Sequence, residues 1–150
     1  ISNIDPAISM VEKKVGLKVL VDTRSEKDTI DLFGAPSPAA VLYLKPEFAE
    51  KYPNTVQALV NAFYKGLQWM ANASAEEVAA VVPESYYLGD REMYVQAVAN
   101  SLPIYSRTGK ITEEGMRGAA ALLSFDESID LNKIDLKKTF DSRFIDKVSK

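Results

Sequence analysis

The side chains available for chemistry are carboxylates, hydroxyls, amides, amines and phenols, because the sequence contains no histidine and no cysteine. Histidine is the usual general base near neutral pH, and cysteine supplies the usual thiolate nucleophile. Their absence excludes a Ser-His-Asp or Cys-His catalyst, and also a zinc site built from thiolates and imidazoles. We therefore expect no cofactor and no metal.

Carboxylates remain as candidates for acid–base chemistry, and two pairs of them are adjacent: Glu76 with Glu77, and Glu113 with Glu114. Neighbouring positions on a helix do not share a face, and acidic residues in a first turn complement the helix dipole. Acid–base catalysis requires convergent groups with shifted pKa values. The sequence shows no such convergence, and we predict that the chain is not an enzyme.

The composition is that of a globular chain: 150 residues, of which 47% are hydrophobic and 26% charged. The net charge is -3 and no stripe of lysine and arginine is present, which gives little support for a nucleic-acid partner. No apolar run approaches the roughly 20 residues that a membrane-spanning helix requires.

Residues 32–73 contain the strongest structural pattern: a proline-rich loop, a short apolar run and a long helix. The apolar run 39–44 is nearly continuous, which is typical of a strand covered on both faces in an α/β sheet. Residues 17–22 predict a second strand. Apolar residues then recur at helical spacing and predict an inward face made of Val56, Leu59, Val60, Phe63, Leu67 and Met70.

Three further helices are indicated by their capping residues. Ser74 and Glu77 fit a capping box before a helix over 75–82, Asp90 precedes a helix that runs to about Ser101, and Thr112 precedes one that runs to Leu123. The tail contains apolar residues that predict a final short helix docked on the body. About four helices against two or three strands leave too little sheet for a self-sufficient α/β domain. One explanation is a missing portion of sheet, supplied by absent sequence or by another chain.

The order of these parts resembles the solute-binding proteins of ABC importers in the nitrate/sulfonate/taurine class, which includes relatives that bind the pyrimidine precursor of thiamine. The resemblance covers nearly all 150 residues but only the C-terminal half of that family. The segments that carry it are Asp5-Pro6-Ala7, 16–22, 34–44, 48–69, 109–115 and 140–145.

The resemblance implies a helix-rich, C-terminal fragment of a type II periplasmic binding protein-like α/β fold. Residues 1–33 would form the end of the second lobe and the return segment, and residues 34–150 the crossover strand and C-terminal helices on a first lobe that is missing. The implied function is capture of nitrate, a sulfonate, taurine or a pyrimidine-like heterocycle for ABC permease subunits. The implied location is periplasmic, or extracellular and membrane-anchored.

The same resemblance places Asp5 and Pro6 at the crevice between the lobes and Ser37 in the loop before the crossover. Asp5 would accept a hydrogen bond from a ligand amine or hydroxyl, or else cap a turn. Ser37 would donate to an oxyanion, or else serve as an ordinary loop group. Tyr43 and Tyr105 would stack on a flat ligand or simply pack.

An alternative function is a helical interaction module, possibly oligomeric, without a small-molecule site. Its motivation is the excess of helix together with the small residues between Gly115 and Ala120, which would let a neighbouring element approach closely.

Overall fold

The computed structural model describes residues 5–148, and every regular element in that range is helical. The α-helices are α1 (Ala7–Val15), α2 (Glu26–Phe33), α3 (Pro46–Lys51), α4 (Pro53–Met70), α5 (Ala75–Ala80), α6 (Arg91–Ser101) and α7 (Glu113–Leu123). Short 3-10 helices follow or connect them: η1 (Glu84–Tyr87), η2 (Leu102–Ile104), η3 (Leu131–Lys133), η4 (Leu136–Lys138) and η5 (Ile145–Lys147).

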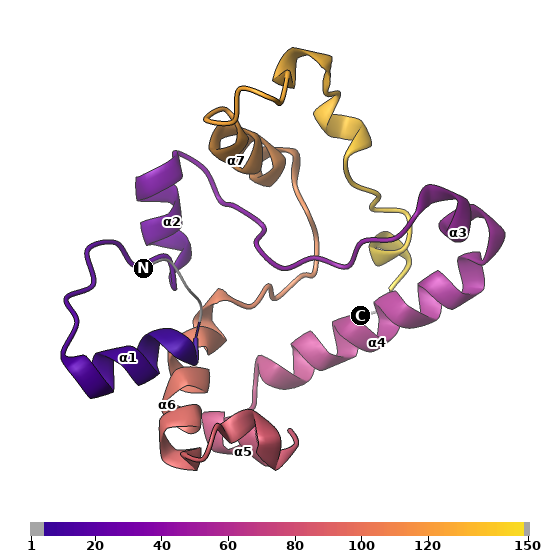
Figure 1. The fold of residues 1–150 in the computed structure, drawn as a ribbon. Coiled ribbons are helices and arrows are strands. Elements are labelled where there is room, and N and C mark those ends of the chain that lie inside the picture. Colours follow the sequence, from indigo (N-terminus) through magenta and orange to yellow (C-terminus); the bar gives the residue numbers. More distant parts are fainter. Residues whose placement is uncertain (1–4, 149–150) are drawn as a thin grey trace.

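The expected α/β fold is therefore wrong for this chain, because neither predicted strand forms. Residues 17–22 and 39–44 are irregular, and within residues 5–148 no backbone hydrogen bond joins either segment to another backbone group. A strand needs a neighbour to complete its ladder, and an apolar sequence pattern does not provide one. The second segment belongs to the stretch that crosses the middle of the molecule from α2 to α3 (Figure 1).

The helix boundaries follow the capping residues. Ser74 and Glu77 form the predicted capping box, with the Ser74 Oγ accepting from the Glu77 amide at 3.2 Å. Asp90 caps α6 by accepting from the Met93 amide, and Thr112 caps α7 by accepting from the Gly115 amide. These three predictions are confirmed.

A first small core forms where α5, η1 and α1 pack against α6. Its buried residues are Ala79 on α5 with Met93 and Ala97 on α6. The hydroxyl of Tyr87 donates to the carbonyl of Ala79 at 2.8 Å, which ties η1 to the end of α5. This packing fixes the position of η1 and α6, two elements that line one of the pockets described below.

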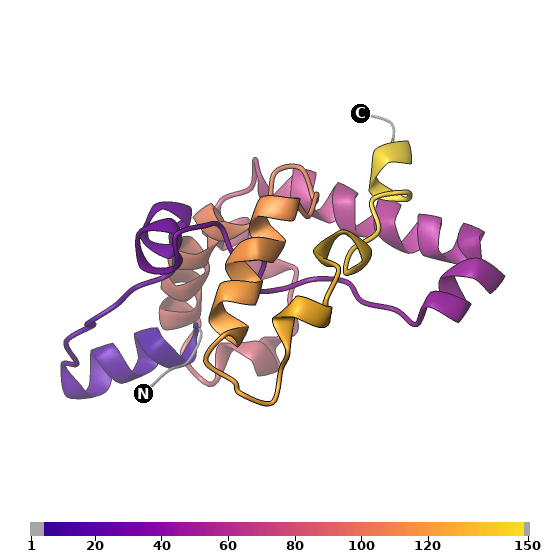
Figure 2. The ribbon, with the colours of Figure 1, turned by 90° about the horizontal axis from the view of Figure 1, so that it is seen from above.

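A second small core lies between α4 and the C-terminal tail. Both ribbon views show the tail leading from α7 to α4 (Figures 1 and 2). Phe144 is buried there together with Val56, and the Gln57 amide donates to the Phe144 carbonyl at 2.9 Å. The predicted docking of the tail is confirmed.

The inward stripe predicted for α4 is largely wrong. Of its six residues only Val56 is buried, whereas the side chain of Phe63 is 60% exposed. The six residues do lie along one apolar face of α4, but within the described residues little of the chain packs on that face. Burial of a helix face depends on a second surface, which the helix itself does not encode.

The small-residue face of α7 is covered by the chain's own proline-rich loop. A Cβ on Gly118 would lie 2.4 Å from the Pro36 carbonyl oxygen, and one on Gly115 would lie 3.3 Å from the Pro38 side chain. The neighbouring element that the small residues were expected to admit is therefore a loop of the same chain. The face is not free for an outside partner.

The chain exposes more surface than its mass predicts. Its accessible area is 11021 Å², whereas a compact monomer of this mass exposes about 7,600 Å². Many large apolar residues are exposed, and among the most exposed are Leu20, Tyr43 and Phe125 at 87–88%. Over residues 5–148, none of the helices has the length and apolar character needed to cross a bilayer.

Candidate functional site

The guanidinium of Arg24, which lies just before α2, lies within 4 Å of three carboxylates, more than any other cation of the described residues. Its Nε donates to both carboxylate oxygens of Asp22 at 2.9 and 3.0 Å, and its Nη2 donates to Asp22 at 2.6 Å. Its Nη1 donates to Asp5 at 3.2 Å and lies 3.8 Å from the Glu12 carboxylate. One cation is thus shared among three carboxylates.

Asp5 is the buried member of this group, with a side chain only 4% exposed. Its second oxygen accepts from the backbone amide of Ser9 at 3.0 Å and from the Ser9 hydroxyl at 2.7 Å. Asn100, on α6, donates to the same hydroxyl at 3.4 Å. The bonds to Ser9 hold the carboxylate at the start of α1, while the Arg24 bond ties it to the segment before α2.

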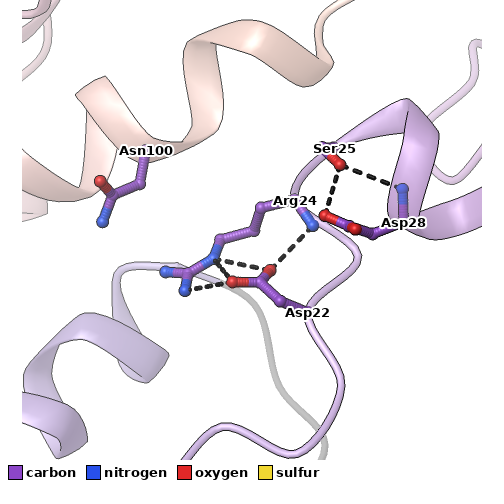
Figure 3. Close-up of a pocket in the computed structure, with 5 residues that line it drawn as sticks. All are labelled: Asp22, Arg24, Ser25, Asp28 and Asn100. Carbon is purple, nitrogen blue, oxygen red and sulfur yellow. Dashed lines mark hydrogen bonds and ion pairs between the residues drawn. The ribbon is translucent and has the colours of Figure 1, made fainter.

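An open pocket of about 270 Å³ lies on the Arg24 side of this network (Figure 3). Three of its lining residues come from the segment that leads into α2, one comes from the first turn of α2, and the fifth, Asn100, comes from α6 across the pocket. The lining residues are Asp22, Arg24, Ser25, Asp28 and Asn100. With two carboxylates against one guanidinium, the wall is acidic on balance.

A larger pocket of about 580 Å³ lies on the Asp5 side. It is lined by the residues that precede α1, by η1 and the turn after it, and by α6: Asp5, Pro6, Ser85, Tyr86, Leu88 and Tyr94. Asp5 lines this pocket and Arg24 lines the other, so the Asp5–Arg24 ion pair links a wall of one pocket to a wall of the other.

The ionisation of the network follows from these contacts. Hydrogen bonds from Arg24 hold the pKa of Asp22 below its ordinary value, and the bonds to Asp22 and Asp5 raise the pKa of Arg24. Burial raises the pKa of the Tyr94 phenol. At neutral pH the Asp22 carboxylate is charged and the phenol neutral, so the walls offer fixed acceptors and aromatic surface.

The structure brings together two of the three predicted ligand residues. Asp5 and Pro6 both line the larger pocket. Ser37 lines neither pocket. Its two neighbours in the sequence, Pro36 and Pro38, pack against α7. Tyr43 and Tyr105 also lie outside both linings, and Tyr43 is 88% exposed.

Sequence reasoning missed Arg24, Asn100 and the tyrosines of the larger pocket. The only local signal was the Asp-x-Arg spacing of Asp22 and Arg24, which resembles any charged surface loop. Asn100 lies 91 residues from Ser9, its hydrogen-bond partner, and a local sequence pattern cannot predict a contact between residues so far apart. Across residues 5–148, no cluster of carboxylates has the geometry of a metal site.

Comparison with known proteins identifies one relative by structure. A solved structure of a protein from Bordetella bronchiseptica RB50 matches this chain with a TM-score of 0.88 and 39% sequence identity. The match covers 95% of this chain and 45% of that protein, so the chain spans less than half of its relative's length. No family model matches the chain, and no curated protein matches it.

Proposed function

We propose that this chain is part of the solute-binding component of an ABC importer. It would hold one side of a ligand site and deliver a small anion or heterocycle to membrane permease subunits. The observation that carries the proposal is the pair of pockets whose walls the Asp5–Arg24 ion pair links. Both pockets are open to solvent, as expected for half of a crevice that a second body closes.

The surface of the chain supports the presence of that second body. Its accessible area exceeds that of a compact monomer by about 3,400 Å², which is more than one side of most permanent interfaces buries. Residues 17–22 and 39–44 carry apolar side chains and, within the described residues, lack backbone partners. Isolated apolar segments of this kind are costly in water.

The relative's length is consistent with such an arrangement. Its chain is more than twice as long as the matched portion, so this fold is held there together with further polypeptide. We propose that here too a first lobe, or a second chain, covers the two apolar segments. A periplasmic or extracellular location is part of the same proposal and rests on the sequence resemblance alone.

A thermal-shift assay on the full-length protein that contains this chain tests the function. We expect one class of solute among nitrate, taurine, alkyl sulfonates and pyrimidines to raise the melting temperature, because a ligand that binds only the native state stabilises it. An unchanged melting temperature across all four classes would contradict the proposal.

Calorimetry on the 150-residue chain gives a second test. Since both pockets are open on this chain, we expect the ligand found with the full-length protein to bind it weakly, above about 1 mM. Submillimolar binding would show that the site is complete without a second body.

The alternative function, a helical interaction module, was motivated in part by a small-residue face on α7 that an outside partner could approach. The small residues of α7 contact the chain's own loop at Pro36 and Pro38. We therefore pursue only the solute-binding function.

A further inference from the structure

One exposed apolar patch belongs to the end of α5, to η1 and to the turn that follows η1. These residues, 80–89, form what we call the α5–η1 surface. Val81, Tyr86 and Leu88 are its large apolar side chains, and they are 67%, 59% and 59% exposed. In Figure 1, α5 lies at the lower edge of the molecule, whereas the stretch between α2 and α3 crosses its middle. The patch is thus not part of the two irregular apolar segments.

The elements that carry this patch are complete within the chain. α5 and η1 pack against α6 around the first small core. The amide of Tyr86 donates to the Pro83 carbonyl at 3.0 Å, and the amide of Asp90 donates to the Tyr87 carbonyl at 3.0 Å. The two irregular apolar segments have no such bonds within residues 5–148. The backbone of the α5–η1 surface therefore needs no further polypeptide to complete it.

Leu88 has a backbone conformation that is unfavourable for leucine. Its φ is 52°, in the left-handed region that glycine and asparagine enter at lower cost than a bulky residue does. Although Leu88 also borders the larger pocket, more than half of its surface is exposed, so its own chain gains little from its burial. Residues held in such conformations cluster at functional sites. An exposed leucine in this conformation is expected where the side chain contacts a partner.

The charges around the patch are predominantly negative. The sequence from residue 66 to residue 90 contains no lysine or arginine and four carboxylates, those of Glu76, Glu77, Glu84 and Asp90. Two of these pair with cations at 2.8 Å, whereas within residues 5–148 Glu77 and Glu84 form no ion pair. Apolar contacts inside a charged rim are the usual anatomy of a protein interface. Carboxylates in that rim favour a partner with basic side chains and repel a second copy of the same surface.

We propose that the α5–η1 surface docks a different protein whose own surface carries lysine or arginine around an apolar patch. Val81 and Leu88 supply the apolar contacts, and Glu77 and Glu84 supply the charged ones. This inference goes beyond the proposed function, because it requires a macromolecular partner and holds whichever solute the pockets bind.

Photo-crosslinking of the full-length protein in the cells that produce it identifies the partner. The probe is p-benzoylphenylalanine in place of Val81, with the exposed Lys65 on α4 as the control position. Mass spectrometry then locates the cross-linked residue. We expect position 81 to give a product with a different protein, in a segment that contains lysine or arginine, and position 65 not to give it. Cross-links only to a second copy or within the full-length protein, or no product, would overturn the proposal.

Affinity measurements with the purified partner test the contacts. Glu84→Lys and Val81→Ser should each weaken docking about tenfold, and raising NaCl from about 50 to about 500 mM should weaken it further by screening the charges. Val81 and Glu84 line neither pocket, so these effects are separate from ligand binding. Glu47→Lys on α3 makes the same charge change at an exposed site elsewhere and should have no effect. Unchanged docking by both variants would overturn the proposal.

Leu88→Asn separates docking from folding. Asparagine suits the left-handed conformation, so the melting temperature of the full-length protein should stay the same or rise. Docking should weaken about tenfold, because an apolar contact is lost. A lower melting temperature with docking as tight as in the original protein would show that Leu88 serves the fold, and would overturn its role as a contact.

Discussion

The guanidinium of Arg24 lies 3.2 Å from the buried carboxylate of Asp5, across 19 residues of sequence. This pair joins the start of α1 to the segment that leads into α2 and links a wall of one pocket to a wall of the other. Removing the cation would leave a carboxylate that is 4% exposed without its charged partner. The pair is therefore needed for the structure around the site as well as for its electrostatics.

Arg24→Met should lower the free energy of unfolding by about 2–3 kcal/mol, because a buried carboxylate loses its cation. Urea denaturation followed by circular dichroism measures this. Lys27→Met is the matched control, since its ion pair with Asp31 is well exposed and should contribute little to stability. Equal effects of the two substitutions would contradict the assigned role of Arg24.

Gly118→Ala should destabilise the protein by about 1–3 kcal/mol, because the new methyl group would lie 2.4 Å from the backbone oxygen of Pro36. Gly66→Ala in α4 is the control: no atom lies within 4 Å of its Cβ position, and alanine favours a helix by up to about 1 kcal/mol. The two substitutions should thus shift the melting temperature in opposite directions. A stabilising Gly118→Ala would show that the loop does not pack on α7.

Asp90 has two roles that different substitutions separate. It caps α6 through the Met93 amide and pairs with Lys13 at 2.8 Å on the surface. Asp90→Asn keeps a capping oxygen and should cost little, whereas Asp90→Ala removes the cap and should be measurably less stable. If the two variants are equally stable in denaturant titrations, the cap does not contribute.

Stability should fall with acidification in a way that depends on Asp22. Its pKa is lowered in the folded protein by hydrogen bonds from Arg24, so the unfolded chain takes up the proton first as the pH falls. The stabilisation is complete above about pH 4 and is lost as the pH falls through the folded-state value. The stability difference between the original protein and Asp22→Asn should therefore shrink between neutral pH and about pH 3. A constant difference would contradict the ion pair.

The sequence was sufficient to predict three helix starts and the docked tail. Capping at Ser74, Asp90 and Thr112 was read from residue type and spacing, because a cap depends only on residues within one helical turn. The docked tail followed from the apolar Phe144. These predictions required no knowledge of how distant segments meet.

The sheet could not be predicted correctly, because a strand depends on its neighbour. The apolar run at 39–44 suggested burial, yet Tyr43 is 88% exposed on this chain. The site was predicted in part, through Asp5 and Pro6. Its remaining walls come from Arg24, Asn100 and Tyr86. These residues are distant from Asp5 and Pro6 in the sequence, and only tertiary packing brings them near.

Hydrogen exchange of the backbone amides at 17–22 and 39–44 tests most directly whether this chain is one part of a larger solute-binding body. It should be measured by mass spectrometry on the full-length protein and on the 150-residue chain under the same conditions. We predict slow exchange in the full-length protein and fast exchange in the 150-residue chain, because within residues 5–148 no backbone group accepts hydrogen bonds from these amides and further polypeptide would supply the acceptors. Fast exchange of both segments in the full-length protein would contradict the account.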